Sequence, residues 1–195
     1  IILASSSPRR IELLKTLYND FKIIKPTFDE SLISKNDKDL ALKESYEKGK
    51  SILNPTYFND LIISADTIVR LNNKVYGKPK DKNEAITFLK ELSNNTHEVV
   101  TGYSLFFKGK VISKQVVTYV TFNFLNEEQI INYVNNEMVL DKAGAYAIQD
   151  DNKFHIIKEI KGSYNNVIGF PIEYIKEDID KLINKLEHSD FFTAP

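Results

Sequence analysis

The chain has 195 residues, 42% of them hydrophobic and 27% charged, a composition typical of a globular protein with a substantial core. Its 26 basic and 27 acidic side chains give a formal net charge of −1, which argues against a protein that wraps a nucleic acid polymer, because such proteins carry a basic excess. The absence of cysteine excludes disulfides, a thiolate nucleophile and a cysteine-ligated zinc site.

No apolar run reaches the roughly 18 residues that span a bilayer, so we expect no membrane partner. No secretory signal is visible, and the cytoplasm is the default expectation for location. The three histidines, His97, His155 and His188, lack the spacing of a zinc site.

The first third of the chain alternates strand and helix patterns. Residues 1–4 are a short apolar run that predicts a buried strand. The Ser-Ser-Ser-Pro turn at 5–8 then predicts a helix from Arg9, with a serine hydroxyl capping its first amides. Residues 21–24 predict a second strand, and 37–53 a helix that ends at an Asn-Pro breaker.

The middle of the chain predicts a strand, a hairpin and a helix. The apolar run 61–65 reads as a buried strand that ends at Asp66. Residues 67–76 then read as a hairpin that turns at two asparagines, 72 and 73. The spacing of Asp81 and Glu84 predicts a capped amphipathic helix through Leu92.

The remaining segments complete a mixed α/β pattern. We expect strands at 98–107 and 111–124, a turn at 150–152 followed by a strand through Ile160, helices at 126–134 and 172–186, a polar loop at 162–171 and a frayed end at 189–195. No repeat or linker divides the chain. We therefore predict one α/β domain over 1–195, with a central mixed sheet flanked by helices, and length allows two small lobes that share a cleft.

The first turn is a candidate phosphate site. Ser5, Ser7 and the helix N-terminus offer hydroxyls and amides, and a helix N-terminus attracts anions. Arg9 and Arg10 add guanidinium groups, which bind phosphate with two parallel bonds. The alternative is an ordinary capped helix with two solvated arginines.

Asp66 and Lys78 form a candidate acid–base pair. A carboxylate at the end of a buried strand lies where ligands gather in α/β folds, although it could also simply cap a turn. The predicted hairpin returns Lys78 to within a residue or two of Asp66 on the neighbouring strand. The sequence leaves open whether the two side chains share a face.

Several other polar residues are weaker candidates. Glu30 could be a second acid, and Gln149 could read a base or ribose edge by hydrogen bonding. Viewed alone, Glu30 and Lys48 read as solvated surface residues, and Gln149 as the polar end of a strand. The Gly-Ser-Tyr-Asn-Asn segment at 162–166 permits close approach to a ligand, or makes a turn.

Taken together, these segments resemble the Maf family of nucleoside triphosphate pyrophosphatases over nearly the whole chain. The resemblance rests on LASSSPRR, SADT and GKP at 3–10, 64–67 and 77–79, and continues at 101–102, 141–149 and 162–171. It implies a Maf/ITPase-like fold with a nucleotide cleft between two lobes. Gly49 departs from the alanine common in the family, and glycine costs about 1 kcal/mol relative to alanine inside a helix.

The resemblance also implies roles. Asp66 matches the proton acceptor that activates water, and it matches, with Glu30, the acids near a Mg²⁺ or Mn²⁺ ion. Positions linked to substrate selection match Arg9, Thr67 and Gln149. Polar positions around the triphosphate and its metal match Ser5, Arg10, Glu30, Lys48 and Lys78.

The expected reaction is attack of water on the α-phosphorus of a nucleoside triphosphate, with release of pyrophosphate. The SPRR and AYAIQ segments resemble the branch that acts on dTTP and UTP, whereas a sister group acts on methylated guanine nucleotides. Two alternatives stay open: a nucleotide-binding regulator of septum formation and cell division, and a house-cleaning hydrolase of modified purine nucleotides. Homodimerisation is plausible by resemblance.

Overall fold

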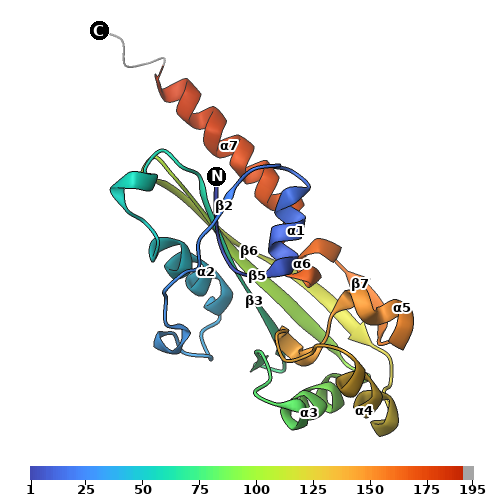
Figure 1. The fold of residues 1–195 in the computed structure, drawn as a ribbon. Coiled ribbons are helices and arrows are strands. Elements are labelled where there is room, and N and C mark those ends of the chain that lie inside the picture. Colours follow the sequence, from blue (N-terminus) through green and yellow to red (C-terminus); the bar gives the residue numbers. More distant parts are fainter. Residues whose placement is uncertain (191–195) are drawn as a thin grey trace.

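A seven-stranded mixed sheet forms the centre of the protein in a computed structural model that describes residues 1–190 (Figure 1). The strand order is β2-β1-β3-β5-β6-β7, and β4 pairs with β3. β1 runs parallel to β2 and β3, and the other pairs are antiparallel. The strands are β1 (Ile2–Ala4), β2 (Lys22–Ile23), β3 (Ile62–Leu71), β4 (Lys74–Tyr76), β5 (Thr96–Phe107), β6 (Lys110–Phe122) and β7 (Ile157–Lys161).

Helices lie on both faces of the sheet, as predicted (Figure 1). The helices are α1 (Pro8–Lys15), α2 (Leu40–Lys50), α3 (Lys82–Leu92), α4 (Glu127–Asn136), α5 (Asp151–Phe154), α6 (Tyr164–Ile168) and α7 (Ile172–Asp190). Short 3₁₀ turns occur at Glu30–Leu32, Pro55–Tyr57, Ala143–Ala145 and Ile148–Asp150. No helix within residues 1–190 is long and apolar enough to cross a membrane.

Alternation along β3 assigns its side chains to two different cores. Ile63 and Ala65 point to the face where α1 and α7 contribute Leu14 and Ile175. Ile62, one residue earlier, packs on the opposite face with residues near α2. Asp66 therefore lies on the α2 face, and its neighbour in the strand, Thr67, lies on the α1 face.

Two glycines let α2 lie directly against the sheet. A Cβ atom on Gly102 of β5 would come within 2.1 Å of the backbone oxygen of Ala41. A Cβ atom on Gly49 would come within 2.3 Å of the Phe106 ring and 2.6 Å of Ser64 Oγ. Gly49 lowers helix propensity, but here it is the residue that fits, and the helix forms because its buried face packs on β3 and β5.

The edge of β3 opposite β5 has a gap. β1 pairs with this edge at Ile62–Ser64, and β4 pairs with it at Val69–Leu71. The intervening residues, 65–68, have no strand beside them on this edge within the described chain. Such a point, where neighbouring strands part, is where α/β sheets place ligands.

Most predicted elements are confirmed, with five corrections. β3 continues through Asp66 to Leu71, so Asp66 lies inside the strand and not at its end. The predicted strand through Ile160 begins only at Ile157, because residues 151–154 form α5. Asn72 and Asn73 make the hairpin turn, with φ of 50° and 64°. The predicted loop at 162–171 instead contains α6, because Ser163 accepts a hydrogen bond from the amide of Asn166 and starts a helix. The serine cap of α1 is also wrong, since Ser7 makes no side-chain cap bond.

The last correction concerns the C-terminus. α7 continues to Asp190, beyond the predicted end at Leu186, so residues 189 and 190 are helical. Residues 191–195 of the predicted frayed end lie outside the described part of the chain.

Candidate active site

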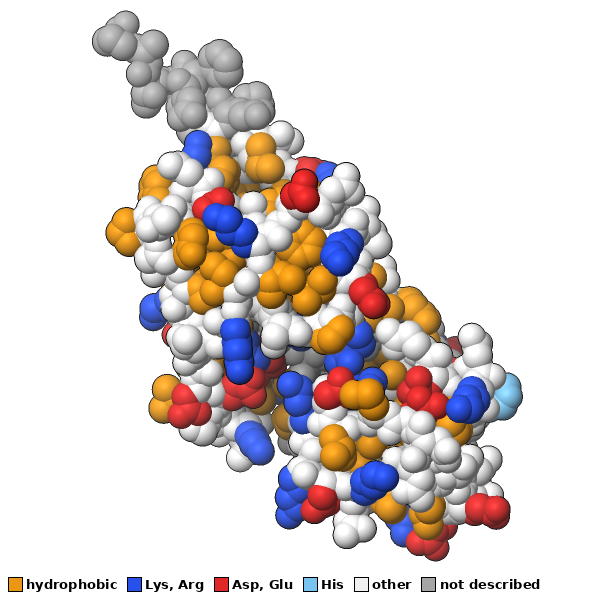
Figure 2. Space-filling view, viewed as in Figure 1, with side chains coloured by type: hydrophobic (Ala, Val, Ile, Leu, Met, Phe, Trp, Pro, Cys, Tyr) orange, Lys and Arg blue, Asp and Glu red, His pale blue; other side chains and the backbone are white. Residues whose placement is uncertain are grey.

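One cavity of ≈ 1010 Å³ opens beside the gap in β3. Figure 2 shows a hollow between the upper and lower parts of the molecule, with charged side chains on both sides. All ten residues singled out from the sequence line this cavity: Ser5, Ser7, Arg9, Arg10, Glu30, Lys48, Asp66, Thr67, Lys78 and Gln149. Asp66, the arginine-bearing turn and Lys78 therefore do converge, as the sequence argument requires.

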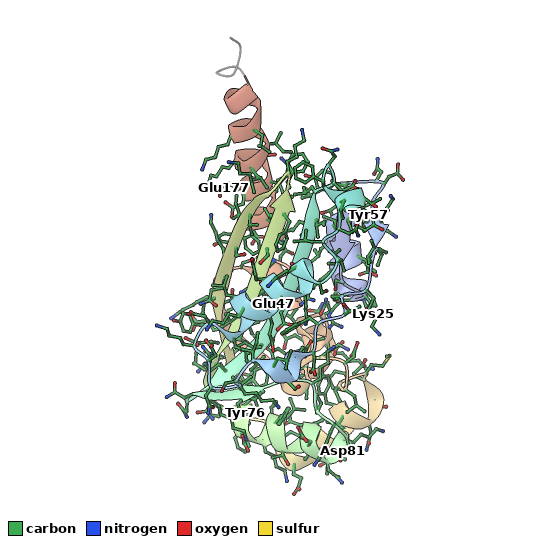
Figure 3. The ribbon with its side chains drawn as sticks, turned by 90° about the vertical axis from the view of Figure 1, so that its left-hand side faces the viewer. Lys25, Glu47, Tyr57, Tyr76, Asp81 and Glu177 are labelled. Atoms are coloured by element: carbon green, nitrogen blue, oxygen red, sulfur yellow. The ribbon has the colours of Figure 1, made fainter. Side chains whose placement is uncertain are left out.

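Lys48 joins the two predicted acids. Its ammonium contacts Asp66 Oδ1 and lies 2.6 Å from Glu30 Oε1. The Lys48 and Asp66 side chains are each 12% exposed, whereas Glu30 is 59% exposed in the loop after β2. Lys48 comes from α2, which lies in front of the sheet in Figure 3 near the labelled Glu47. This lysine, predicted to be a solvated surface residue when read alone, is instead buried within an ion-pair cluster.

Asp66 carries its negative charge inside the protein. Burial by itself raises the pKa of Asp66, but a hydrogen bond with Glu44 and the charges of Lys48 and Arg10 outweigh burial and lower it. For Lys48, burial opposes the charged form, yet the contacts with Asp66 and Glu30 raise its pKa overall. Asp66 and Lys48 are therefore an ionised pair at neutral pH.

Arg10 joins several segments of the cavity wall by hydrogen bonds. Its Nε donates to the carbonyl of Gly169 at 2.8 Å, and its Nη1 to the carbonyl of Ala65 at 3.0 Å. Nη1 and Nη2 also reach the hydroxyls of Ser5 and Thr67, at 3.4 and 3.1 Å. Because four donor contacts go to the protein itself, Arg10 stabilises the open edge of β3 and leaves one N–H of its five for another partner.

Thr67 is held on the α1 face of β3. Its hydroxyl lies 2.9 Å from that of Thr101 on β5 and 3.3 Å from the carbonyl of Gly169. Together with the bond from Arg10, these contacts fix the side chain at the cavity wall. Thr67 and Asp66 thus reach one cavity from opposite faces of the same strand.

Arg9, Lys78 and Gln149 surround the opening. Arg9 pairs with Asp141 at 3.3 Å and also donates to the Asp141 carbonyl at 3.4 Å. Lys78 and Gln149 are exposed. Pairing between β3 and β4 ends at Val69–Tyr76, and Lys78 lies two residues beyond it in the lining of the cavity.

The family description "Maf-like protein" matches residues 1–182, which is nearly the whole chain. The chain belongs to the Maf family. Relatives named dTTP/UTP pyrophosphatase include those of Thermosipho africanus, 43% identical with 90% of this chain and 89% of the relative covered, and Thermosipho melanesiensis, 44% identical with 90% and 93% covered. The protein of Clostridium acetobutylicum, with the same name, is 40% identical over 88% of this chain and 92% of its own.

A solved structure, "The structure of the Staphylococcus aureus Ham1 protein", aligns with 91% of this chain and 98% of that one. Its TM-score is 0.47 at 15% sequence identity, so the Maf assignment depends on the family match and the relatives.

This Maf family site contains an acid that the sequence argument missed. Glu44 lies one helical turn before Lys48 on α2, is 7% exposed and lines the cavity. Burial, followed by the hydrogen bond and negative charge of Asp66, raises the pKa of Glu44 to about 9. The available signal was a carboxylate on the face of α2 that buries Leu40 and Ala41.

Tyr133 of α4 is a second residue that the sequence argument missed. Its hydroxyl accepts a hydrogen bond from the amide of Ala147 at 3.1 Å and donates to Asp150 Oδ2 at 2.6 Å. These two contacts flank Gln149. Nearby, Ala145 has a positive φ of 63°, an uncommon conformation for a residue with a Cβ atom, so the packing around this Maf segment holds it in place.

Proposed function

We propose that this Maf family chain is a nucleoside triphosphate pyrophosphatase that hydrolyses dTTP and UTP to the monophosphate and pyrophosphate. The observation that carries the proposal is one cavity in which a buried, ionised Asp66 lies among Lys48, Arg10 and Lys78. A triphosphate requires several positive charges around it. The names of the relatives, which cover most of the chain, supply the nucleobase class.

In this proposal Asp66 accepts the proton of the attacking water, which cleaves the bond between the α- and β-phosphates. A carboxylate paired with a cation is a weak base, so Asp66 accepts the proton as the water attacks the phosphorus and becomes more acidic. Lys48 and Lys78 neutralise charge on the departing pyrophosphate, and the remaining N–H of Arg10 adds to this charge. Ser5 and Ser7 bind phosphate oxygens, and Arg9, Thr67 and Gln149 select the nucleotide.

A divalent cation, Mg²⁺ or Mn²⁺, fits the carboxylates of this cavity. Asp66 and Glu30 already converge on a single cation, the Lys48 ammonium, and hard oxygen ligands suit these ions. No group of three or more His, Cys, Asp or Glu side chains suited to a metal occurs within the described residues. Asp66 and Glu30 would therefore hold the ion with phosphate oxygens and water, and the ion would neutralise charge on the phosphates.

We also propose that residues 1–195 act as one domain, with a lobe on each side of the cavity. Separate apolar clusters support this division: one joins α3 and α4, and another joins α1 and α7. A homodimer and a cytoplasmic location remain predictions from the sequence.

The test is release of pyrophosphate from dTTP, UTP, CTP, GTP and methylated guanine nucleotides, with and without Mg²⁺. We expect Mg²⁺-dependent turnover of dTTP and UTP, and Asp66→Asn should reduce it by about 10²-fold or more. Binding of nucleotide without turnover would favour a regulator of division, and preference for modified purines would favour a house-cleaning hydrolase. Parental activity in Asp66→Asn would remove Asp66 from the base role.

A further inference from the structure

The Lys48 ammonium lies where two carboxylates of the cavity meet. It contacts Asp66 Oδ1 directly and lies 2.6 Å from Glu30 Oε1. The two carboxylates belong to different segments of the chain: Glu30 lies in a 3₁₀ turn and Asp66 in β3. The lysine side chain is 12% exposed, so its charge is largely withdrawn from water and neutralised by these two groups.

The same oxygens are the ones a divalent cation would use. A Mg²⁺ ion needs oxygen ligands at 2.0–2.1 Å and cannot share a carboxylate oxygen with an ammonium lying in the same direction. Two cations at one point also repel each other strongly in a buried setting. Asp66 offers no easy alternative, because its side chain is buried and Glu44 and Arg10 line the cavity beside it.

The Lys48 ammonium could pair with a bound nucleotide instead of the two carboxylates. Its side chain is a flexible four-carbon stem from the last turn of α2, and Lys48 lines the cavity with Ser7 and Lys78. A triphosphate in this cavity would offer several anionic oxygens to the ammonium. The ion pair in the nucleotide-free protein can therefore be exchanged for an ion pair with the substrate without leaving the lysine buried and unpaired.

We propose that the point between Asp66 and Glu30 now held by the Lys48 ammonium is the divalent-cation position of the nucleotide-bound site, and that nucleotide binding withdraws Lys48 from it. The nucleotide-free protein then excludes the metal, and metal and nucleotide bind with positive coupling, each increasing the affinity of the other by the same factor. This inference rests on the proposed function for the nucleotide and for Asp66 and Glu30 as the residues that would hold the ion.

The test measures Mn²⁺ binding by calorimetry and by the electron paramagnetic resonance signal of free Mn²⁺, in protein without nucleotide. Removing the ammonium in Lys48→Gln should tighten Mn²⁺ binding by about 10-fold or more, since a competing charge leaves the site. Lys48→Met is the second variant, in case the amide of glutamine itself occupies the position. Lys78→Gln is the matched control, because it removes the same charge from a cavity lysine that makes no described contact with either carboxylate.

The second arm adds α,β-imido-dUTP, which resists cleavage between the α- and β-phosphates. In the parent protein this analogue should tighten Mn²⁺ binding by about 10-fold or more. In Lys48→Met the coupling should be smaller, because only the direct bonds from the phosphate oxygens to the ion remain. The proposal is overturned if both Lys48 variants bind Mn²⁺ as weakly as the parent, or if Lys78→Gln tightens binding as much as they do. If the parent protein does not bind the analogue, the proposed function is contradicted instead. Mn²⁺ binding by the parent and the Lys48 variants without nucleotide still tests the inference.

Discussion

Glu44 and Asp66 bring two carboxyl groups together on the face of the sheet that α2 covers, and each shifts the pKa of the other. Two carboxylates this close cannot both be ionised, so one of them keeps a proton. The lysine and arginine beside Asp66 leave the negative charge there, and burial and that charge raise the pKa of Glu44 to about 9. The free protein thus carries a neutral acid inside a cavity of charged groups.

This arrangement predicts an alkaline loss of stability that depends on Glu44. The folded protein keeps the Glu44 proton up to about pH 9, while the unfolded chain releases it near 4.5, so the free energy of unfolding decreases as pH rises between these values. Glu44→Gln should remove more than about 1 kcal/mol of the decrease between pH 6 and 9, measured by urea unfolding. The lowered pKa of Asp66 acts below pH 4, outside this range.

Glu47→Gln is the control for Glu44, because Glu47 lies on the same helix, is partly exposed and pairs with Lys50. It should leave the alkaline slope of the parent unchanged. An identical slope in Glu44→Gln and the parent would mean that Glu44 is ionised in the folded protein.

His97 predicts a loss of stability in acid. Its ring is 1% exposed, Nδ1 has no hydrogen-bond partner, and burial lowers its pKa to about 4. The unfolded chain binds the proton near pH 6.5, so the contribution of His97 to stability is full above that value and decreases by about 3 kcal/mol as pH falls to 4. His97→Gln should flatten this slope in unfolding titrations, whereas exposed His155→Asn should not; equal slopes in all three proteins would contradict the burial argument.

Tyr133 should act on nucleotide selection from outside the cavity. Tyr133→Phe keeps the ring that packs edge-on against Phe154 and removes the hydroxyl that holds Ala147 and Asp150 on either side of Gln149. We expect KM for dTTP to rise by about 5- to 10-fold while kcat changes by less than about 2-fold, because a loosened turn weakens binding of the base rather than the chemistry.

The comparison for Tyr133 uses Tyr119→Phe, which removes a hydroxyl from a tyrosine that is 48% exposed on β6. Steady-state kinetics on dTTP, UTP and CTP well below the melting temperature separate selection from stability. A general loss of kcat on all three substrates, with KM unchanged, would assign Tyr133 to stability alone.

Gly49 should resist replacement by the residue that favours helices. Alanine gains about 1 kcal/mol in helix propensity. The added methyl group would meet the Phe106 ring at 2.3 Å, and such overpacking costs typically ~1–3 kcal/mol, so Gly49→Ala should lower the free energy of unfolding. Lys50→Ala, at the next and exposed position, should not lower it by overpacking.

Phe106→Leu tests whether contact with the Phe106 ring is what destabilises Gly49→Ala. If the clash with Phe106 is the cause, the double variant should be more stable than the sum of the two single changes predicts, by about 1 kcal/mol or more in a double-mutant cycle. Simple additivity would place the cause elsewhere.

The sequence predicted which residues line the cavity, because these residues belong to motifs next to strands and helices that the local sequence pattern indicates clearly. Asp66 follows the apolar residues that begin β3, although the strand continues to Leu71, and Arg9 and Arg10 lie in the first turn of α1 after the serines. All three residues line the cavity. The hairpin turn was also predicted, because two asparagines specify it, and Lys78 after the hairpin lines the same cavity as Asp66.

The contacts within the cavity were decided only by tertiary structure. Glu44 and Lys48 read locally as ordinary residues of a charged helix, and they become a buried acid and a buried base because Gly49 and Gly102 let α2 approach the sheet. Arg10 likewise reads as a phosphate ligand until Gly169, 159 residues away, takes one of its donors. Sequence determines the residue types and the elements that carry them, whereas burial and long-range pairing set the charge of each group, and these depend on the packing of segments far apart in the chain.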